Sequence, residues 1–163
     1  QQVSTAAART HAGRLVQAHG EQIVDSTGDL THLFPTVAAL EGAQLAMPEA
    51  RKQTVLRLAS ALAAGQIDLD PGADRTLARE RLAAVKGIGP WTVETIAMRA
   101  LGDPDAFLPT DLGVASLAGR IGLPAGADLV RHAERWRPWR AYAVQHLWAL
   151  GDHPVNHLPQ GEK

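Results

Sequence analysis

Residues 84–92 read Ala84-Val85-Lys86-Gly87-Ile88-Gly89-Pro90-Trp91-Thr92, and they separate two stretches of helical composition. Gly87 and Gly89 flank one apolar residue, and glycine tolerates the positive φ angles of tight turns. Ile88 can fill the core beneath the turn, and Pro90 suits the first position of a following helix. The segment therefore predicts two helices joined by a tight turn.

The main-chain N–H groups of this turn and of the next helix's first turn are expected to point outward. With the positive end of the helix dipole they form a site for an anion. Such a site can bind a DNA phosphate independently of the base sequence. The alternative is an ordinary connector between helices, since Gly-x-Gly alone is common. The full run from Val85 to Thr92 is more specific and favours DNA binding.

The rest of the chain is helical in composition. Ala and Leu dominate and β-branched clusters are sparse, which favours helices over strands. Turn-rich residues at 25–35 and 66–73 predict irregular connections. We therefore expect an all-α domain of about eight short helices over 1–151, followed by a loose tail over 152–163. The expected helices are 3–19, 36–41, 48–64, 74–85, 90–101, one from 111 that ends near 119–122, 127–135 and 138–150.

Length and composition exclude several classes of protein. The chain has 163 residues, which suits one domain or one lobe of a larger enzyme. It has no cysteine, which excludes disulfides, thiolate zinc sites, iron–sulfur clusters and a cysteine nucleophile. No apolar run approaches the roughly 18–20 residues of a membrane span, and no signal segment opens the chain. We expect a cytoplasmic monomer without a membrane partner, associated with the nucleoid if it is bacterial.

The net charge of −1 hides an asymmetry along the chain. Residues 1–74 carry 5 Lys and Arg against 8 Asp and Glu, whereas residues 75–163 carry 11 against 9. Four arginines fall within 131–140, beside Trp136 and Trp139. Arginine interleaved with aromatic residues suits phosphate and base contacts. Composition alone favours the alternative of a solvated helix face, with the two tryptophans in the core.

Two further features are candidates for chemistry. Asp111 follows the stiff segment 107–110 at the start of a helix, where the helix dipole favours an ionised carboxylate. Such a carboxylate could stabilise a developing cation, although by itself Asp111 is better explained as a helix cap. Trp91 and Trp148 could sandwich a flat base, and a cationic base would gain attraction from their rings. Their alternative role is core packing.

Together these pieces resemble the helix-hairpin-helix DNA glycosylase superfamily, and more narrowly its AlkA-type 3-methyladenine DNA glycosylase II branch. The hairpin with Asp111 about twenty residues later carries the likeness to the superfamily. The run Arg135-Trp136-Arg137-Pro138-Trp139-Arg140, followed by Trp148, narrows it to the branch. The likeness covers essentially all of 1–150. Members have a preceding α/β lobe that is missing from this sequence, so we expect a C-terminal fragment of a longer or fused repair protein.

The resemblance implies roles for individual residues. Asp111 matches the catalytic aspartate. The matching base-pocket positions are Trp91 and Trp148, with Thr95 and Leu112 where some relatives carry further aromatics. Gln2, with Gln1 beside it, matches the wedge that fills the gap left by the flipped nucleotide. The DNA-contacting hairpin positions are Gly87, Ile88, Gly89, Trp91 and Thr92. The carbonyls that hold a monovalent cation, Na+ or K+, in relatives match Ala83, Val85 and Gly87, and no other cofactor is expected.

The resemblance also implies an activity. The enzyme would flip an alkylated purine of the 3-methyladenine or 7-methylguanine type out of double-stranded DNA and hydrolyse its N-glycosidic bond, in base excision repair. Trp91 stands where bifunctional relatives place a lysine nucleophile, so we expect no strand-cleaving lyase activity. The alternatives are a non-catalytic DNA-binding module of a multidomain alkylation-response protein and a purely structural helical domain. Asp111 discriminates between the enzyme and the binding module, since a binding module needs no carboxylate at the sugar.

Overall fold

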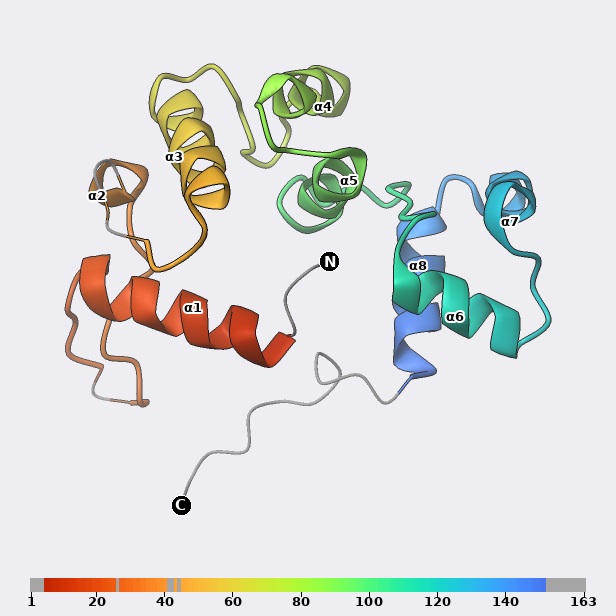
Figure 1. The fold of residues 1–163 in the computed structure, drawn as a ribbon, viewed down its shortest axis with the longest axis horizontal. Helices are drawn as coiled ribbons and strands as arrows, with labels where there is room; N and C mark the ends of the chain where they lie inside the picture. The colour runs from red at the N-terminus through yellow and green to blue at the C-terminus, as the bar shows by residue number, and fades with distance from the viewer. Residues whose placement is uncertain (1–4, 26, 41–42, 44, 152–163) are drawn as a thin grey trace. The chain divides into compact units, whose positions relative to one another are not determined.

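The computed structural model describes residues 5–25, 27–40, 43 and 45–151, and within them the protein is all-helical. Gln1, Gln2 and the tail 152–163 lie outside these residues, so the expectations for them stay predictions. In the described part, the only β pairing is one isolated bridge between Gln22 and His32. The helices are α1 Thr5–His19, α2 Val37–Leu40, α3 Glu49–Ala63, α4 Arg75–Ala84, α5 Pro90–Arg99, α6 Leu112–Arg120, α7 Gly126–Ala133, the 3-10 helix η1 Glu134–Trp136, and α8 Arg140–Ala149 (Figure 1).

The helix ends follow local sequence signals. Asp74 Oδ1 caps α4 by accepting the N–H groups of Thr76 at 2.9 Å and Leu77 at 3.0 Å. Gly65 follows α3 with a φ of +64°, the left-handed conformation in which helices commonly end. The helix expected over 127–135 differs, because the chain tightens into the 3-10 helix η1 after Ala133. The all-α prediction is confirmed.

The chain divides into two compact units. Among the described residues, the first unit contains 69–79 and 89–151, and the second contains those from 5 to 68 together with 80–88. Helix α4 contributes to both units, and the connection from α4 to α5 carries the chain from one to the other.

The first unit has a continuous apolar core. Helices α5 to α8 surround an irregular segment, 103–110, whose Ala106, Phe107 and Leu108 are at most 5% exposed. Helices α6 and α8 pack against each other beside this segment (Figure 1). Trp136 packs against the core edge-on to Phe107, as expected. The expectation of a buried Trp139 is wrong: it stands at the N-cap of α8, 58% exposed, against Tyr142.

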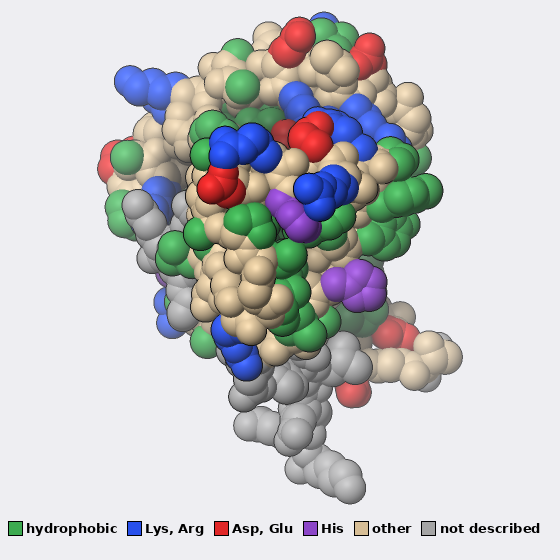
Figure 2. Space-filling view, turned by 90° about the vertical axis from the view of Figure 1, so that its right-hand side faces the viewer, with side chains coloured by type: hydrophobic (Ala, Val, Ile, Leu, Met, Phe, Trp, Pro, Cys, Tyr) green, Lys and Arg blue, Asp and Glu red, His purple; other side chains and the backbone are tan. Residues whose placement is uncertain are grey.

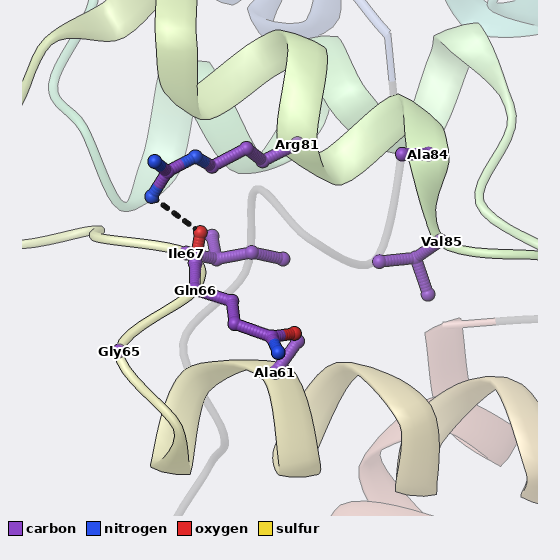
Figure 3. A pocket seen from close by; sticks show the side chains of 7 residues that line it. All are labelled: Ala61, Gly65, Gln66, Ile67, Arg81, Ala84 and Val85. Carbon is purple, nitrogen blue, oxygen red and sulfur yellow. Dashed lines mark hydrogen bonds between the residues drawn. The ribbon is translucent and has the colours of Figure 1, made fainter.

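The second unit holds α1, α2, α3 and the end of α4. A hollow of about 580 Å³ lies between α3, the turn after it and α4 (Figure 3). Arg81 reaches across it, and its guanidinium donates a hydrogen bond of 2.6 Å to the carbonyl of Gln66. No carboxylate lines this hollow, so it does not suit chemistry at a developing cation.

Candidate active site

Asp111 is the centre of the candidate site, and it lies in the first unit. The residue is only 9% exposed and forms the N-cap of α6. Its Oδ1 accepts hydrogen bonds from the Val114 N–H at 2.9 Å and from the Trp148 indole Nε1 at 3.0 Å. Its Oδ2 accepts one from the Trp91 indole Nε1 at 2.9 Å. The two tryptophans predicted from the sequence therefore converge on the predicted aspartate.

These hydrogen bonds keep Asp111 ionised despite its burial. Burial by itself raises the pKa of this carboxyl. The hydrogen bonds from the Trp148 indole, the Val114 amide and the Trp91 indole outweigh burial and lower the pKa of Asp111 below its ordinary value of 3.8. All three donors are neutral, so the carboxylate keeps its full negative charge at neutral pH.

The neighbouring aspartates of the same unit are neutralised by arginines. Asp103 accepts a 2.6 Å hydrogen bond from Arg79, and Asp105 accepts two from Arg140, at 2.7 and 2.8 Å. No ion pair with Asp111 is found among the residues that the structure describes. Asp111 is thus the aspartate in this region whose charge remains available to a cation.

Gly113 is a residue of the site that the sequence interpretation missed. A Cβ at this position would lie 3.1 Å from Asp111 Oδ1 and 3.3 Å from Trp148 Cδ1 and Nε1. Glycine therefore gives the Trp148 indole room to reach the carboxylate. The available signal was a glycine inside the first turn of a helix, where it costs about 0.5–1 kcal/mol relative to alanine.

Thr95 and Leu112 were also predicted to line the base pocket. Thr95 stands one turn after Trp91 on α5, and its hydroxyl donates to the Trp91 carbonyl at 2.7 Å. Leu112 follows Asp111 and is 75% exposed. Neither is among the hydrogen-bond donors to Asp111, and their roles in a base pocket stay predictions. Arg99 lies over the Trp148 ring, 5.6 Å from its centroid.

Comparison with known proteins relates this arrangement to a family, although no protein-family model matches the chain. The chain is 52% identical, over its whole length, to a probable bifunctional transcriptional activator/DNA repair enzyme AlkA of Mycobacterium tuberculosis. It is 34% identical over 91% of its length to the DNA-3-methyladenine glycosylase 2 of Escherichia coli. The chain belongs to the AlkA-type branch of the helix-hairpin-helix DNA glycosylase superfamily. It spans 34% of the M. tuberculosis protein and 53% of the E. coli protein.

The solved structures agree with this assignment. The 3-methyladenine DNA-glycosylase from Archaeoglobus fulgidus matches 91% of the chain with a TM-score of 0.76 and 25% identity, and the match covers 53% of that protein. The AlkA-type likeness predicted from the hairpin, Asp111 and the Arg-Trp stretch is therefore confirmed, as is the helix-hairpin-helix glycosylase fold.

The hairpin of this AlkA-type domain uses its two glycines differently. Gly87 has a φ of +101°, so it needs glycine. Gly89 has an ordinary φ of −94° and is the N-cap of α5, with no heavy atom within 4 Å of a built Cβ. The expectation that both glycines exploit positive φ is thus correct for Gly87 and wrong for Gly89. Ile88 is buried, as predicted, so any DNA contact at this position comes from its backbone.

The Arg-Trp stretch that marks the AlkA-type branch forms ion pairs. Arg137 pairs with Asp105 and Glu134, and Arg140 pairs with the same two carboxylates. Figure 2 shows several basic side chains lying directly beside acidic ones on one face of the molecule. Arg137 and Arg140 therefore pair with carboxylates in this structure, and the phosphate contacts considered from the sequence stay a prediction.

Proposed function

We propose that this domain is the catalytic part of a monofunctional DNA glycosylase that releases alkylated purines from double-stranded DNA. One observation carries the proposal: the buried Asp111 carboxylate is kept ionised by neutral donors and has no cationic partner among the described residues. The names of the relatives, DNA repair enzyme AlkA and DNA-3-methyladenine glycosylase, support the same substrate class.

The chemistry needs a fixed negative charge beside the sugar. Cleavage of the N-glycosidic bond leaves positive charge on the sugar, and a preorganised carboxylate stabilises that oxocarbenium-like state. Oδ1 of Asp111 accepts two of the described hydrogen bonds and Oδ2 accepts one. We therefore assign Oδ2, with its open lone pair, to face the sugar. A water oxygen then bonds to the sugar carbon that the base has left and releases a proton to bulk water, which completes the hydrolysis.

Alkylation at N3 or N7 makes the purine cationic, so it leaves as a neutral base without being protonated. This explains how one carboxylate can suffice. The Trp91 and Trp148 rings would attract a cationic base through their quadrupoles, by about 0.5–2 kcal/mol each.

We propose that the enzyme has no lyase activity. A lyase needs an amine that attacks the sugar and forms a Schiff base. Trp91 stands at the position that matches the lysine of bifunctional relatives, and its indole nitrogen is hydrogen-bonded to Asp111. The chain has three lysines, Lys52, Lys86 and Lys163. Lys86 precedes the hairpin glycines and is out of register for this role.

The hairpin fits the monovalent cation that the family implies. The carbonyls of Ala83, Val85 and Gly87 are neutral oxygen donors, which suit a hard cation. The Val85 carbonyl accepts one hydrogen bond, from the Ile88 N–H at 3.0 Å, which leaves it a second lone pair. These carbonyls would hold a Na+ or K+ ion, whose positive charge would favour an approaching DNA phosphate. No cofactor is proposed for the chemical step.

Single-turnover release of methylated bases from dimethyl-sulfate-treated duplex DNA tests the function, with Asp111→Asn as the matched variant. We expect the native protein to release bases and the variant to lose release while its salt-dependent DNA affinity persists. Borohydride should trap no covalent complex. DNA binding without release by the folded native protein would instead support the binding-module alternative.

A further inference from the structure

The segment that delivers Asp111 is fastened to the start of α8. The Ala141 N–H donates to the carbonyl of Pro104 at 2.8 Å. Arg140 binds Asp105 with two parallel hydrogen bonds, Nε to Oδ1 at 2.7 Å and Nη2 to Oδ2 at 2.8 Å. A two-pronged pair of this kind fixes direction as well as distance. The side chains are only 15% and 20% exposed, which limits screening by solvent.

The same segment is also tied to α5. Glu94 Oε2 accepts the Phe107 N–H at 3.4 Å, and Arg79 holds both Glu94 and Asp103. Helix α5 begins with Pro90 and Trp91, and α8 carries Trp148 near its end. The segment before Asp111 is thus attached to each of the two helices whose indoles bind Asp111.

Helix α8 connects the Asp105 contact to the active carboxylate. Arg140 is the first residue of this helix and Trp148 is its ninth. At 1.5 Å per residue their Cα atoms are separated along the axis by about 12 Å, on one rigid element. A shift or rotation of α8 at Arg140 would therefore be transmitted to the Trp148 indole. The 3.0 Å contact with Asp111 Oδ1 would lengthen accordingly.

We propose that the Asp105–Arg140 pair is a positioning device, which sets α8 so that the Trp148 indole stays on Asp111. The proposal rests on the proposed function for its catalytic readout. Neither residue is among the hydrogen-bond partners of Asp111, so the pair acts indirectly, through α8 and the segment that α8 fastens. Arg140 also contacts Glu134 at 3.3 Å and lies over the Phe107 ring. These partners occupy its guanidinium, which argues against a primary role in phosphate binding.

The test uses Asp105→Asn and Arg140→Lys, with Asp128→Asn as the matched control. Arg140→Lys keeps the charge but loses the planar fork. Asp128→Asn breaks an exposed ion pair to Arg131 on α7, away from the segment before Asp111. The indole Nε1–H signals of Trp91 and Trp148 are followed by NMR as a function of pH, and base release is measured in single turnover.

In the native protein both indole signals should move together as Asp111 titrates. In Asp105→Asn and Arg140→Lys the Trp148 signal should move toward that of a solvent-bonded indole, and the Asp111 titration midpoint should rise. Base release should slow by about tenfold or more, because small misplacements of catalytic groups are costly, while DNA affinity changes less than about twofold. Asp128→Asn should leave every readout at its native value.

An unchanged Trp148 signal and an unchanged Asp111 midpoint in folded Asp105→Asn would overturn the proposal. If that variant does not fold, Arg140→Lys decides by the same two signals, and native signals there would also overturn it. A native protein that releases no base would refute the proposed function alone. The NMR signals would still decide whether the Asp105–Arg140 pair positions Trp148.

Discussion

Replacing Gly87 by alanine should destabilise the protein because two costs add at one residue. Gly87 has a φ of +101°, which an L-residue adopts at a cost of roughly 1–2 kcal/mol. Its Cβ would also lie 2.0 Å from Thr54 Oγ1 and 3.0 Å from Thr54 Cβ and Cγ2. Crowding of this kind costs about 1–3 kcal/mol. We expect a total loss of about 2–5 kcal/mol, out of the roughly 5–15 kcal/mol that stabilises a typical domain.

The two costs can be separated with Thr54→Ala. Thr54 Oγ1 donates to the Ala50 carbonyl at 3.0 Å, and it lies 3.3 Å from the Lys86 carbonyl. Removing its Oγ1 and Cγ2 relieves the crowding but leaves the backbone strain at residue 87. The double variant should therefore recover about 1–3 kcal/mol of the loss relative to Gly87→Ala, as a coupling energy between neighbours.

Gly89→Ala is the matched control, since Gly89 has a φ of −94° and open space at its Cβ position. Its stability should stay within about 0.5 kcal/mol of the native value, as for substitutions away from special backbone positions. Its DNA affinity should fall if a phosphate approaches the backbone there. Urea unfolding followed by far-UV circular dichroism measures all variants. A native unfolding midpoint for Gly87→Ala, or no recovery in the double variant, would refute the reasoning.

Three further predictions concern the candidate site. The pKa of Asp111 in the folded protein lies below 3.8, so the carboxylate's contribution to stability is present above that pH and is lost as the pH falls through the folded pKa. Asp111→Asn should therefore lose less of its free energy of unfolding in urea as the pH is lowered. An unchanged dependence of the unfolding free energy on pH would contradict this. Trp148→Phe keeps a ring but removes a hydrogen bond to a charged group, worth about 1.5–3 kcal/mol, so base release should slow by roughly ten- to a hundredfold; native single-turnover rates would count against the contact. Gly113→Ala should displace the Trp148 indole and slow release with little change in DNA binding; an unshifted indole NMR signal would argue that the helix absorbs the methyl group.

None of the helices in the described part of the chain is long and apolar enough to cross a membrane. Within the same residues, no cluster of His, Asp and Glu side chains is arranged to hold a metal ion.

Much of the local architecture was predictable because its causes are local. The caps at Asp74 and Asp111 and the stop at Gly65 depend on residues within a few positions of each other. The burial of Ile88 between two glycines also followed from the hairpin pattern. The exposure of Trp139 did not, because it depends on how the chain enters α8 and on which face of that helix meets the core.

The amino-acid sequence by itself determined the helical class, the positions of the hairpin and of the helix caps, and the absence of thiol chemistry from this chain. The convergence on Asp111 needed the folded chain, since Trp91 and Trp148 are 20 and 37 positions away from it. The same holds for the arginines, whose partner Asp105 is 32 positions from Arg137 and 35 from Arg140. Helix periodicity and capping act over one or two turns, whereas the charge left on Asp111 depends on which distant groups pack around each carboxylate.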